Sequence, residues 1–279
     1  MLSIQNIEFG YNGSRKLFSS LSLTLEKGNI YGLLGRNGAG KTTLLKLASG
    51  LLFPQVGHIT YDSNNVADRL PVTLSSMYII PEEFTLPDFT APQYVNLYAP
   101  FYPGFDHAKM TALLIDFEVD AAQHLNKMSF GQKKKFIIAF AIASNCPLVI
   151  MDEPTNGLDI PSKSKFRKII ASSIDENRCF IISTHQVRDL ESLIDPVLIL
   201  EDGRIVLNEG IGRLSEKLSF VNTAKGEQPN GPVLYREPVF GGEYLLCENV
   251  QGEDSNVDFE LLFNAVQANS KQIVEYLNR

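Results

Sequence analysis

Eight residues near the N-terminus form a pattern that binds phosphate. The segment Gly35-Arg36-Asn37-Gly38-Ala39-Gly40-Lys41-Thr42 matches G-x-x-x-x-G-K-[ST]. Its glycines let backbone N–H groups converge on phosphate oxygens, and the N-terminus of a following helix adds partial positive charge. We expect Lys41 to reach the β- and γ-phosphates and the Thr42 hydroxyl to bind Mg²⁺. The pattern predicts a nucleotide site that includes Gly35, Asn37, Gly38, Ala39, Gly40, Lys41, Thr42 and Thr43.

Two adjacent acids follow a buried strand later in the chain. The apolar run Leu148–Met151 ends in Asp152 and Glu153. A strand that ends beside the phosphate loop would place Asp152 where a carboxylate can hold Mg²⁺, commonly through water. Glu153 would then lie one residue farther out, where it could polarise a water that attacks the γ-phosphate. Two surface acids at a strand end are the alternative.

These segments resemble the ATP-binding cassette (ABC) family over about residues 1–212. The most discriminating piece is Met128-Ser129-Phe130-Gly131-Gln132, which is similar to the family's L-S-G-G-Q signature and precedes Asp152 at the family's spacing. The resemblance implies that Ser129, Gly131 and Gln132 contact ATP bound to the opposite subunit. Ser129 would also cap the next helix, and a plain cap is the rival interpretation. Phe130 departs from the family, because it stands where the signature has a glycine.

Four more residues take roles only through this resemblance. Tyr11 corresponds to the aromatic residue that stacks on adenine, unless it is a half-buried packing residue. Asp159 would lie at the dimer interface, with a helix N-cap as the rival. His185 resembles the switch histidine that contacts the γ-phosphate and orients water, which makes Glu153, His185 and Lys41 the expected catalytic residues. Glu82 stands where the family has glutamine and could still bind Mg²⁺, or it is a solvated loop acid.

The resemblance further implies an ATPase coupled to transmembrane transport, with ATP and Mg²⁺ as cofactors. It implies a homodimer, or a heterodimer with another ABC ATPase subunit, that closes around two Mg-ATP and drives a separate transmembrane permease. The single short cassette resembles exporters more than importers. We expect the chain to be cytoplasmic and peripheral on the inner face of the membrane. The alternative is a soluble ABC ATPase in cofactor assembly, DNA repair or translation.

The elements that must position these residues follow from hydrophobic periodicity. Short apolar runs separated by helical segments predict an α/β fold with a mostly parallel sheet. With the phosphate loop, the family resemblance implies that this is a P-loop NTPase core. Alternating residues near the N-terminus predict an antiparallel β subdomain. A proline-rich insertion from Glu82 to about Asn126 predicts a helical arm, which we extend to about residue 140. We expect a helix at Lys133–Ser144 and a polar loop at Asp62–Asp68.

The end of the chain has a different composition. We expect a cassette at 1–212 and a small α+β accessory domain at 213–279. Residues 222–232 predict a linker or long turn, Val233–Leu246 two strands joined at Gly241-Gly242, and the terminal residues an amphipathic helix. The region carries no chemical motif, so a dimerising or regulatory role stays open beside a packing role.

Bulk properties exclude several classes of protein. The net charge is −7, and an acidic chain is a poor candidate for nonspecific nucleic-acid binding, so no nucleic-acid partner is expected. No apolar stretch reaches the length of a membrane-spanning helix, and the N-terminus has no signal-peptide pattern. The three cysteines have no metal-ligand spacing and are expected to be reduced thiols. The run Lys133-Lys134-Lys135 indicates a solvated helix face, or else phosphate attraction near the site.

Overall fold

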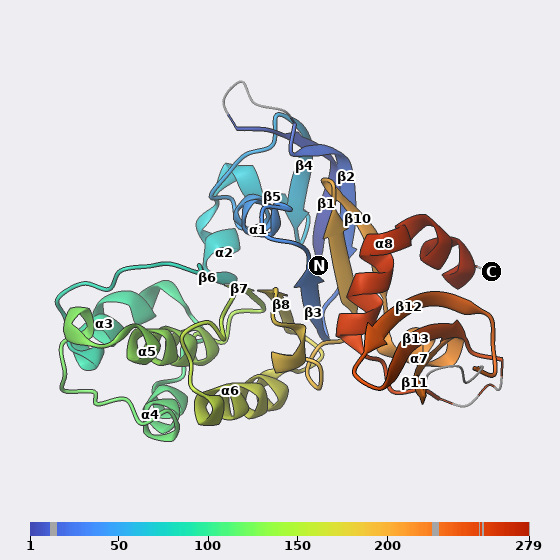
Figure 1. Cartoon of the computed structure of the whole chain (residues 1–279). Coiled ribbons are helices and arrows are strands. Elements are labelled where there is room, and N and C mark those ends of the chain that lie inside the picture. Colours follow the sequence, from blue (N-terminus) through green and yellow to red (C-terminus); the bar gives the residue numbers. More distant parts are fainter. Residues whose placement is uncertain (12–15, 225–228, 251, 253, 279) are drawn as a thin grey trace.

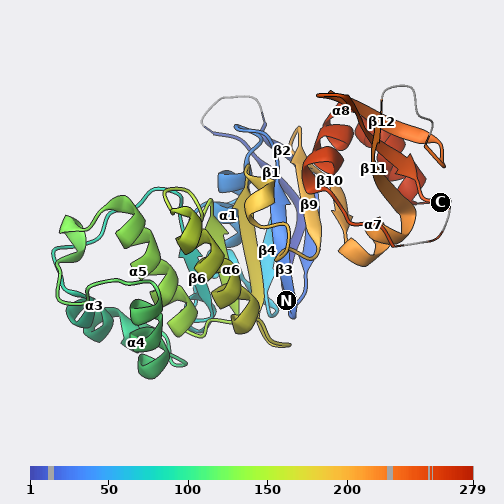
Figure 2. The same ribbon diagram turned by 60° about the horizontal axis from the view of Figure 1, so that its bottom comes forward.

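The computed structural model describes residues 1–11, 16–224, 229–250, 252 and 254–278. The chain forms three parts that lie side by side (Figure 1): a helical arm, a central body with two β-sheets, and a C-terminal unit. The turned view keeps the arm and the C-terminal unit on opposite sides of the central body (Figure 2). The prediction of a mixed α/β fold is confirmed.

The first sheet of the central body is antiparallel, as predicted. Its strand order is β2-β1-β4-β5. Leu2 and Ile4 of β1 are buried, because alternate side chains of a strand point to one face. A register shift between Ile4 and Ile7 then brings Ile7 to the buried face as well. The expected loop at Asp62–Asp68 is wrong in part, since it contains β5 and the short helix η1. The bounds are β1 Leu2–Phe9, β2 Phe18–Leu25, β4 Val56–Tyr61, β5 Asn64–Asn65 and η1 Val66–Asp68.

The second sheet has the order β10-β9-β3-β8-β7-β6 and is mostly parallel. Strands β9, β3, β8, β7 and β6 run parallel to one another, and β10 pairs antiparallel with β9 through a tight turn at 202–203. Parallel strands end at one edge, so residues that follow several strands meet there. The bounds are β3 Asn29–Leu34, β6 Met77–Ile80, β7 Leu148–Asp152, β8 Cys179–Thr184, β9 Val197–Glu201 and β10 Arg204–Glu209.

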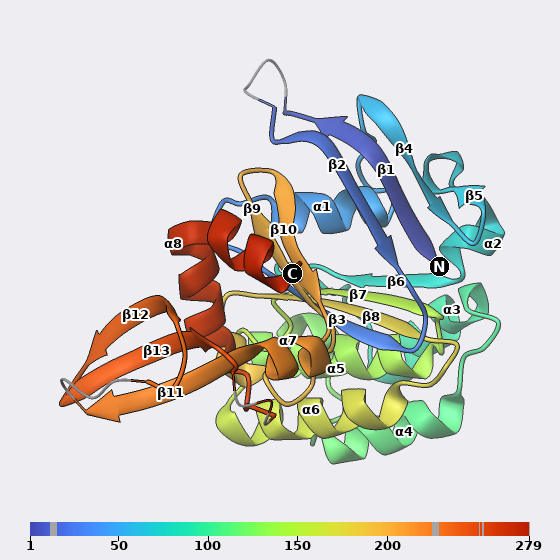
Figure 3. The same cartoon turned by 90° about the vertical axis from the view of Figure 1, so that its right-hand side faces the viewer.

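Helices cover both faces of the parallel sheet. Helix α1 (Lys41–Ala48) lies between the two sheets, and helices α5 (Phe130–Ala143) and α6 (Ile160–Ser173) cover the opposite face (Figure 3). Two hydrophobic clusters result, one on each side of the sheet. Helix α5 begins three residues before the expected Lys133, because Ser129 and Gln132 form a capping box there.

The insertion forms the predicted helical arm. Thr90 and Gln93 form a capping box at the start of α3, and Asp106 caps α4. Tyr94 packs edge-to-face against Phe136 and Phe140 of α5, which ties the arm to the central body. The bounds are α2 Pro71–Leu74, α3 Ala91–Tyr98, η2 Ala99–Phe101, α4 His107–Asp116 and η3 Leu125–Lys127.

The C-terminal unit consists of a three-stranded antiparallel sheet and the helix α8, which is kinked at Asn269. The sheet has the order β11-β13-β12, and the predicted hairpin at Gly241-Gly242 is present. The linker predicted at 222–232 is wrong for residues 222–224, which belong to β11, and residues 225–228 lie outside the described part. The bounds are η4 Val187–Asp189, α7 Ile211–Lys217, β11 Leu218–Ala224, β12 Val233–Val239, β13 Gly242–Glu248 and α8 Phe259–Leu277.

Candidate functional site

The phosphate loop connects β3 to α1 with the geometry that the motif requires. Gly40 is the N-cap of α1 and has φ of 104°, a region that favours glycine. A Cβ at Gly40 would come within 3.0 Å of the Phe18 ring, so a larger residue would also clash. The loop therefore presents backbone N–H groups at a helix N-terminus, which is an anion-binding arrangement.

Lys41 is held at the floor of this loop. Its Nζ donates hydrogen bonds to the Gly35 carbonyl at 2.7 Å and to the Arg36 carbonyl at 3.4 Å. Burial lowers the pKa of Lys41, and the carboxylates of Glu153, Asp152 and Glu82 oppose that shift. The ammonium thus faces the acids across the space where phosphates would lie.

Asp152 and Thr42 meet at the end of β7. The Thr42 hydroxyl donates to Asp152 Oδ2 at 2.6 Å, and the Ser183 hydroxyl donates to Asp152 Oδ1. Asp152 is buried, and β7 and β8 pair at Asp152 and Ser183. Neighbouring strands therefore orient this carboxylate toward the phosphate loop.

These donors fit Mg²⁺. A hydroxyl and a carboxylate on one side, with space for waters and phosphate oxygens on the other, is the donor set that Mg²⁺ prefers with nucleotides. Within the described ranges, no group of three or more His, Cys, Asp or Glu side chains could hold a metal by itself.

Glu153 lies directly beside His185. Its Oε1 is 2.8 Å from His185 Nδ1, while its buried Oε2 has no hydrogen-bond partner among the residues that the structure describes. Burial raises the pKa of Glu153, and the contact with His185 opposes the rise. The residue has φ of 46°, and strain of this kind often accompanies function. A carboxylate that lines the cleft and is held by one orienting partner can accept a proton from water.

Glu82 reaches the same cleft from the end of β6. Its Oε1 accepts a hydrogen bond from Asn156 Nδ2 at 3.2 Å, and its side chain lines the cleft with Asp152 and Glu153. A carboxylate at this place adds negative charge opposite Lys41. The geometry is compatible with the predicted role of Glu82 as a ligand of Mg²⁺.

Tyr11 lies at the outer end of the cleft. Its hydroxyl is 3.0 Å from Thr43 Oγ1, and its ring packs edge-to-face on Phe9 with centroids 5.1 Å apart. The side chain remains 51% exposed, which leaves ring surface available for stacking on a base.

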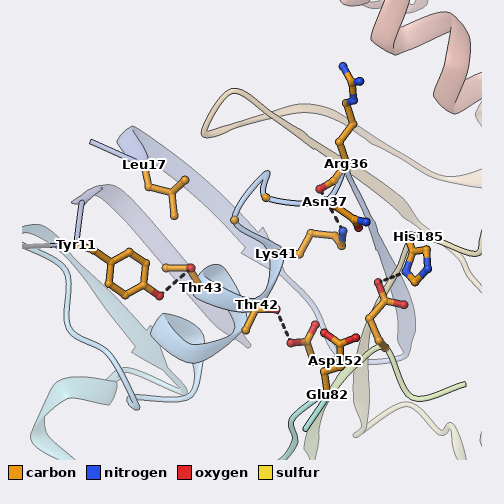
Figure 4. A pocket seen from close by; sticks show the side chains of 13 residues that line it. Tyr11, Leu17, Arg36, Asn37, Lys41, Thr42, Thr43, Glu82, Asp152 and His185 are labelled. Carbon is orange, nitrogen blue, oxygen red and sulfur yellow. Dashed lines mark hydrogen bonds and ion pairs between the residues drawn. The ribbon is translucent and has the colours of Figure 1, made fainter. Parts of the chain in front are cut away.

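Together these residues line one cleft of about 590 Å³ (Figure 4). In the figure Tyr11 and Thr43 lie at one end, and His185 lies at the other, beside Lys41 and Asn37. Two lining residues, Leu17 and Arg36, were not predicted to take part. Leu17 has no recognisable sequence signal, while Arg36 belongs to the loop motif. Ser183 was also missed as the residue that orients Asp152, although it directly precedes Thr184 and His185.

The structure places the signature segment outside this cleft. Ser129 is exposed and does not line the cleft, and neither do Gly131, Gln132 and Asp159. Ser129 accepts a hydrogen bond from the Gln132 N–H, and Asp159 accepts one from the Ser162 N–H. Both cap interpretations are therefore observed, and both residues still face outward at the surface of the chain.

One expectation about the lysine run is wrong. Lys134 is fully buried, with 0% exposure, whereas Lys133 and Lys135 are partly exposed. Burial lowers the pKa of Lys134 to about 8. The helical periodicity of α5 turns the middle lysine toward the protein interior, which a run of three like charges conceals.

The cysteines and the hydropathy agree with the sequence analysis. Cys146, Cys179 and Cys247 are buried free thiols, and burial raises the pKa of each. Among the described residues, no helix is long and apolar enough to cross a membrane.

Comparisons with known proteins agree with this geometry. Residues 18–156 match the sequence profile described as "ABC transporter". The chain is 28% identical over 249 residues to the ABC transporter ATP-binding protein YtrB of Bacillus subtilis, covering 86% of this chain and 85% of that protein. It is 30% identical over 209 residues to the Nod factor export ATP-binding protein I of Burkholderia orbicola, covering 73% and 68%.

A solved structure described as an ATP-binding subunit of an ABC transporter superposes on this one. The TM-score is 0.69 at 26% identity, and the match covers 75% of this chain and 90% of that chain. Sequence profile, relatives and fold agree on one family. The chain therefore belongs to the ABC transporter family, as a subunit that binds and hydrolyses ATP.

Proposed function

We propose that two copies of this chain, or this chain and a related subunit, close around two Mg-ATP and drive a separate transmembrane permease. One observation carries the proposal. The cleft holds Lys41, Asp152, Glu153 and His185, while Ser129 lies exposed outside it at the start of α5. A helix N-terminus with a serine cap is suited to phosphate, so it would complete the site of a second subunit.

The residues of the cleft divide the work of hydrolysis. Tyr11 would stack on adenine, and the loop from Gly35 to Thr43 would hold the phosphates. Thr42, Asp152 and Glu82 would hold Mg²⁺, which neutralises phosphate charge when it is bound. Lys41 would stabilise charge that develops on the γ-phosphoryl group.

Glu153 and His185 would organise the attacking water. The Glu153 carboxylate would accept the water's proton, and His185 would hold its Oε1 in place. Because His185 is partly exposed at the cleft, it would also contact the γ-phosphate.

The permease would contact the arm. Leu97, Phe101 and Ile115 are large apolar side chains that lie exposed on the arm. Such a surface suits a hydrophobic partner. The chain would then lie on the inner face of the membrane, in the cytoplasm.

The similarity to a Nod factor export protein supports an exporter. The net charge of −7 supports the expectation of no nucleic-acid partner.

The same proposal divides the chain at about residue 212. Residues 1–212 would form the cassette, with the arm at about 82–140, and residues 213–279 an accessory domain.

A soluble ABC ATPase for DNA repair or translation usually has a long coiled-coil insertion. The described arm instead has helices of 8 and 10 residues, α3 and α4.

Glu153→Gln tests the proposal directly. The variant should bind ATP as the wild type does, lose hydrolysis by on the order of 10² or more, and elute as a dimer with Mg-ATP in size-exclusion chromatography. Wild-type turnover would remove Glu153 as the base. A Glu153→Gln protein that stays monomeric with Mg-ATP would contradict a site shared between two subunits. Co-purification with a hydrophobic multi-span protein would separate a transporter subunit from a soluble ATPase.

A further inference from the structure

One buried lysine joins two segments of the ATP site that are far apart in the sequence. Lys134 lies in the second turn of α5, shortly after Ser129. Its Nζ donates a hydrogen bond to the Glu82 carbonyl at 3.1 Å and another to the Glu153 carbonyl at 3.4 Å. This ammonium group therefore joins α5, on which Lys134 lies, to the start of the arm and to the residue after β7.

Aromatic rings enclose this ammonium. Nζ lies 5.4 Å from the ring centroid of Phe84 and 5.3 Å from that of Phe130, and the two rings are 6.0 Å apart. Both contacts are within cation–π range. Phe130 thus has a function at the position where the family signature has glycine: its ring turns back over Gly157 and the lysine. The rings exclude water, which strengthens the bonds to the carbonyls.

Stability alone does not account for a charge in this place. Burying an ammonium group has a large desolvation cost, and the carboxylates of Glu82, Asp152 and Glu153 offset it only in part, because the pKa of Lys134 remains lowered to about 8. An unbranched apolar side chain could fill the same space without that cost. The ammonium group donates hydrogen bonds to two main-chain carbonyls, which an apolar side chain cannot do.

We propose that Lys134 is a positioning residue that fixes Glu153 relative to Glu82 and thereby links the arm to the hydrolytic centre. The inference rests on the proposed function, because it takes Glu153 as the base and the arm as the contact for a permease. When the arm shifts, the Glu82 carbonyl moves with it, and Lys134 carries that displacement to Glu153. Lys134 itself does not reach the cleft, since it is not among the cleft-lining residues.

Substitutions at Lys134 test this role in the full-length protein. Lys134→Met removes the charge and keeps an unbranched chain, Lys134→Arg keeps donors and charge, and Lys135→Met is the matched control on the same helix. We expect Lys134→Met to lower kcat by on the order of 10-fold to 100-fold, as misplacement of a catalytic group does, while KM for ATP stays close to the wild-type value. Lys134→Arg should recover part of kcat, and Lys135→Met should match the wild type.

Thermal unfolding separates positioning from folding. A positioning role predicts that Lys134→Met keeps or raises Tm while kcat falls. A fall in Tm together with equal losses of ATP binding and kcat would overturn the inference. If Lys134→Met does not fold, Lys134→Leu is measured in its place, with Lys135→Leu as the matched control. A kcat of Lys134→Leu equal to that of the control would also overturn the inference.

The variant Glu153→Gln separates a failure of the positioning role of Lys134 from a failure of the proposed function. If Glu153→Gln loses turnover and Lys134→Met keeps it, the positioning role is wrong and the proposed function stands. If Glu153→Gln keeps turnover, the base assignment fails and the positioning role fails with it. In single-turnover assays the double variant should be no slower than Glu153→Gln alone, because no base remains to be positioned. Independent, multiplying losses would refute the inference.

Discussion

At the scale of single residues, the ATP cleft is organised by pairs of side chains from different elements. Thr42 and Asp152 are joined across the cleft, and Glu153 is joined to His185. Each pair links a residue at a strand end to a residue on the adjacent strand or helix. Replacing one member should therefore change a defined step rather than the whole fold.

Lys41→Ala should abolish ATP binding. The Lys41 ammonium lies beside the phosphate loop and is only 7% exposed, so its charge would act on a bound phosphate from a buried position. Isothermal calorimetry with ATP measures the effect. Lys46→Ala, on the same helix and away from the cleft, should bind ATP normally. An unchanged affinity in Lys41→Ala would take this lysine out of the site.

Asp152→Asn should weaken the binding of Mg²⁺ rather than the binding of ATP. The amide keeps the size of the side chain but loses the charge that attracts the ion, so the Mg²⁺ concentration for half-maximal hydrolysis should rise by on the order of tenfold or more. ATP affinity in the presence of EDTA should stay close to that of the wild type. The same Mg²⁺ dependence in both proteins would exclude Asp152 as a ligand.

At the scale of elements, the C-terminal helix α8 is built into the central body. Phe259, Leu262 and Val266 belong to the same hydrophobic cluster as residues of α5 and β8. Arg188 of η4 forms an ion pair with Glu260 of α8, and the Glu191 carboxylate accepts from the Phe259 N–H. The boundary expected near residue 212 therefore does not separate two independent cores.

Leu262→Ala should destabilise the whole described chain by about 2–5 kcal/mol, the usual cost of a buried leucine-to-alanine change. Since the cluster is continuous, chemical unfolding should remain a single transition with a lower midpoint. Lys271→Ala, at an 86% exposed side chain on the same helix, should leave the midpoint in place. A separate early transition in Leu262→Ala would indicate that the C-terminal unit unfolds alone.

At the scale of the whole molecule, the two halves of the proposed site lie at separate places on one chain. The cleft lies at the carboxyl edge of the parallel sheet, while Ser129 lies exposed where α5 begins, outside the cleft. A second subunit turned to face the first would bring them together. Dimerisation and hydrolysis should then depend on the same residues.

Ser129→Arg should leave ATP binding by the monomer intact and prevent the ATP-dependent dimer, because a large side chain would fill the space for phosphate at the helix N-terminus. Hydrolysis should fall with the dimer. Light scattering of Ser129→Arg in the Glu153→Gln background, with Mg-ATP, measures this outcome. Thr111→Arg adds the same charge on exposed α4 and should still dimerise. A dimer of Ser129→Arg would refute the shared site.

Much of the fold and cleft could be predicted, because the patterns are local. The strand at Leu2–Phe9, the phosphate loop and the acid pair after β7 each occupy one short segment, and periodicity and spacing define them. The fold and the ABC family are confirmed. The domain boundary and the individual residue roles stay predictions. Contacts between residues close in the sequence, such as the Ser129 cap of α5, could be predicted from the sequence alone.

Only the tertiary structure decided which distant groups share one space. Lys134 looks like its neighbours in the sequence, yet the packing of α5 against the arm and β7 buries it between Glu82 and Glu153. The continuity of α8 with the central core likewise appears only when the chain is folded. Local patterns are determined by backbone geometry over a few residues. Burial depends on which surfaces meet across long separations, and no short pattern encodes that meeting.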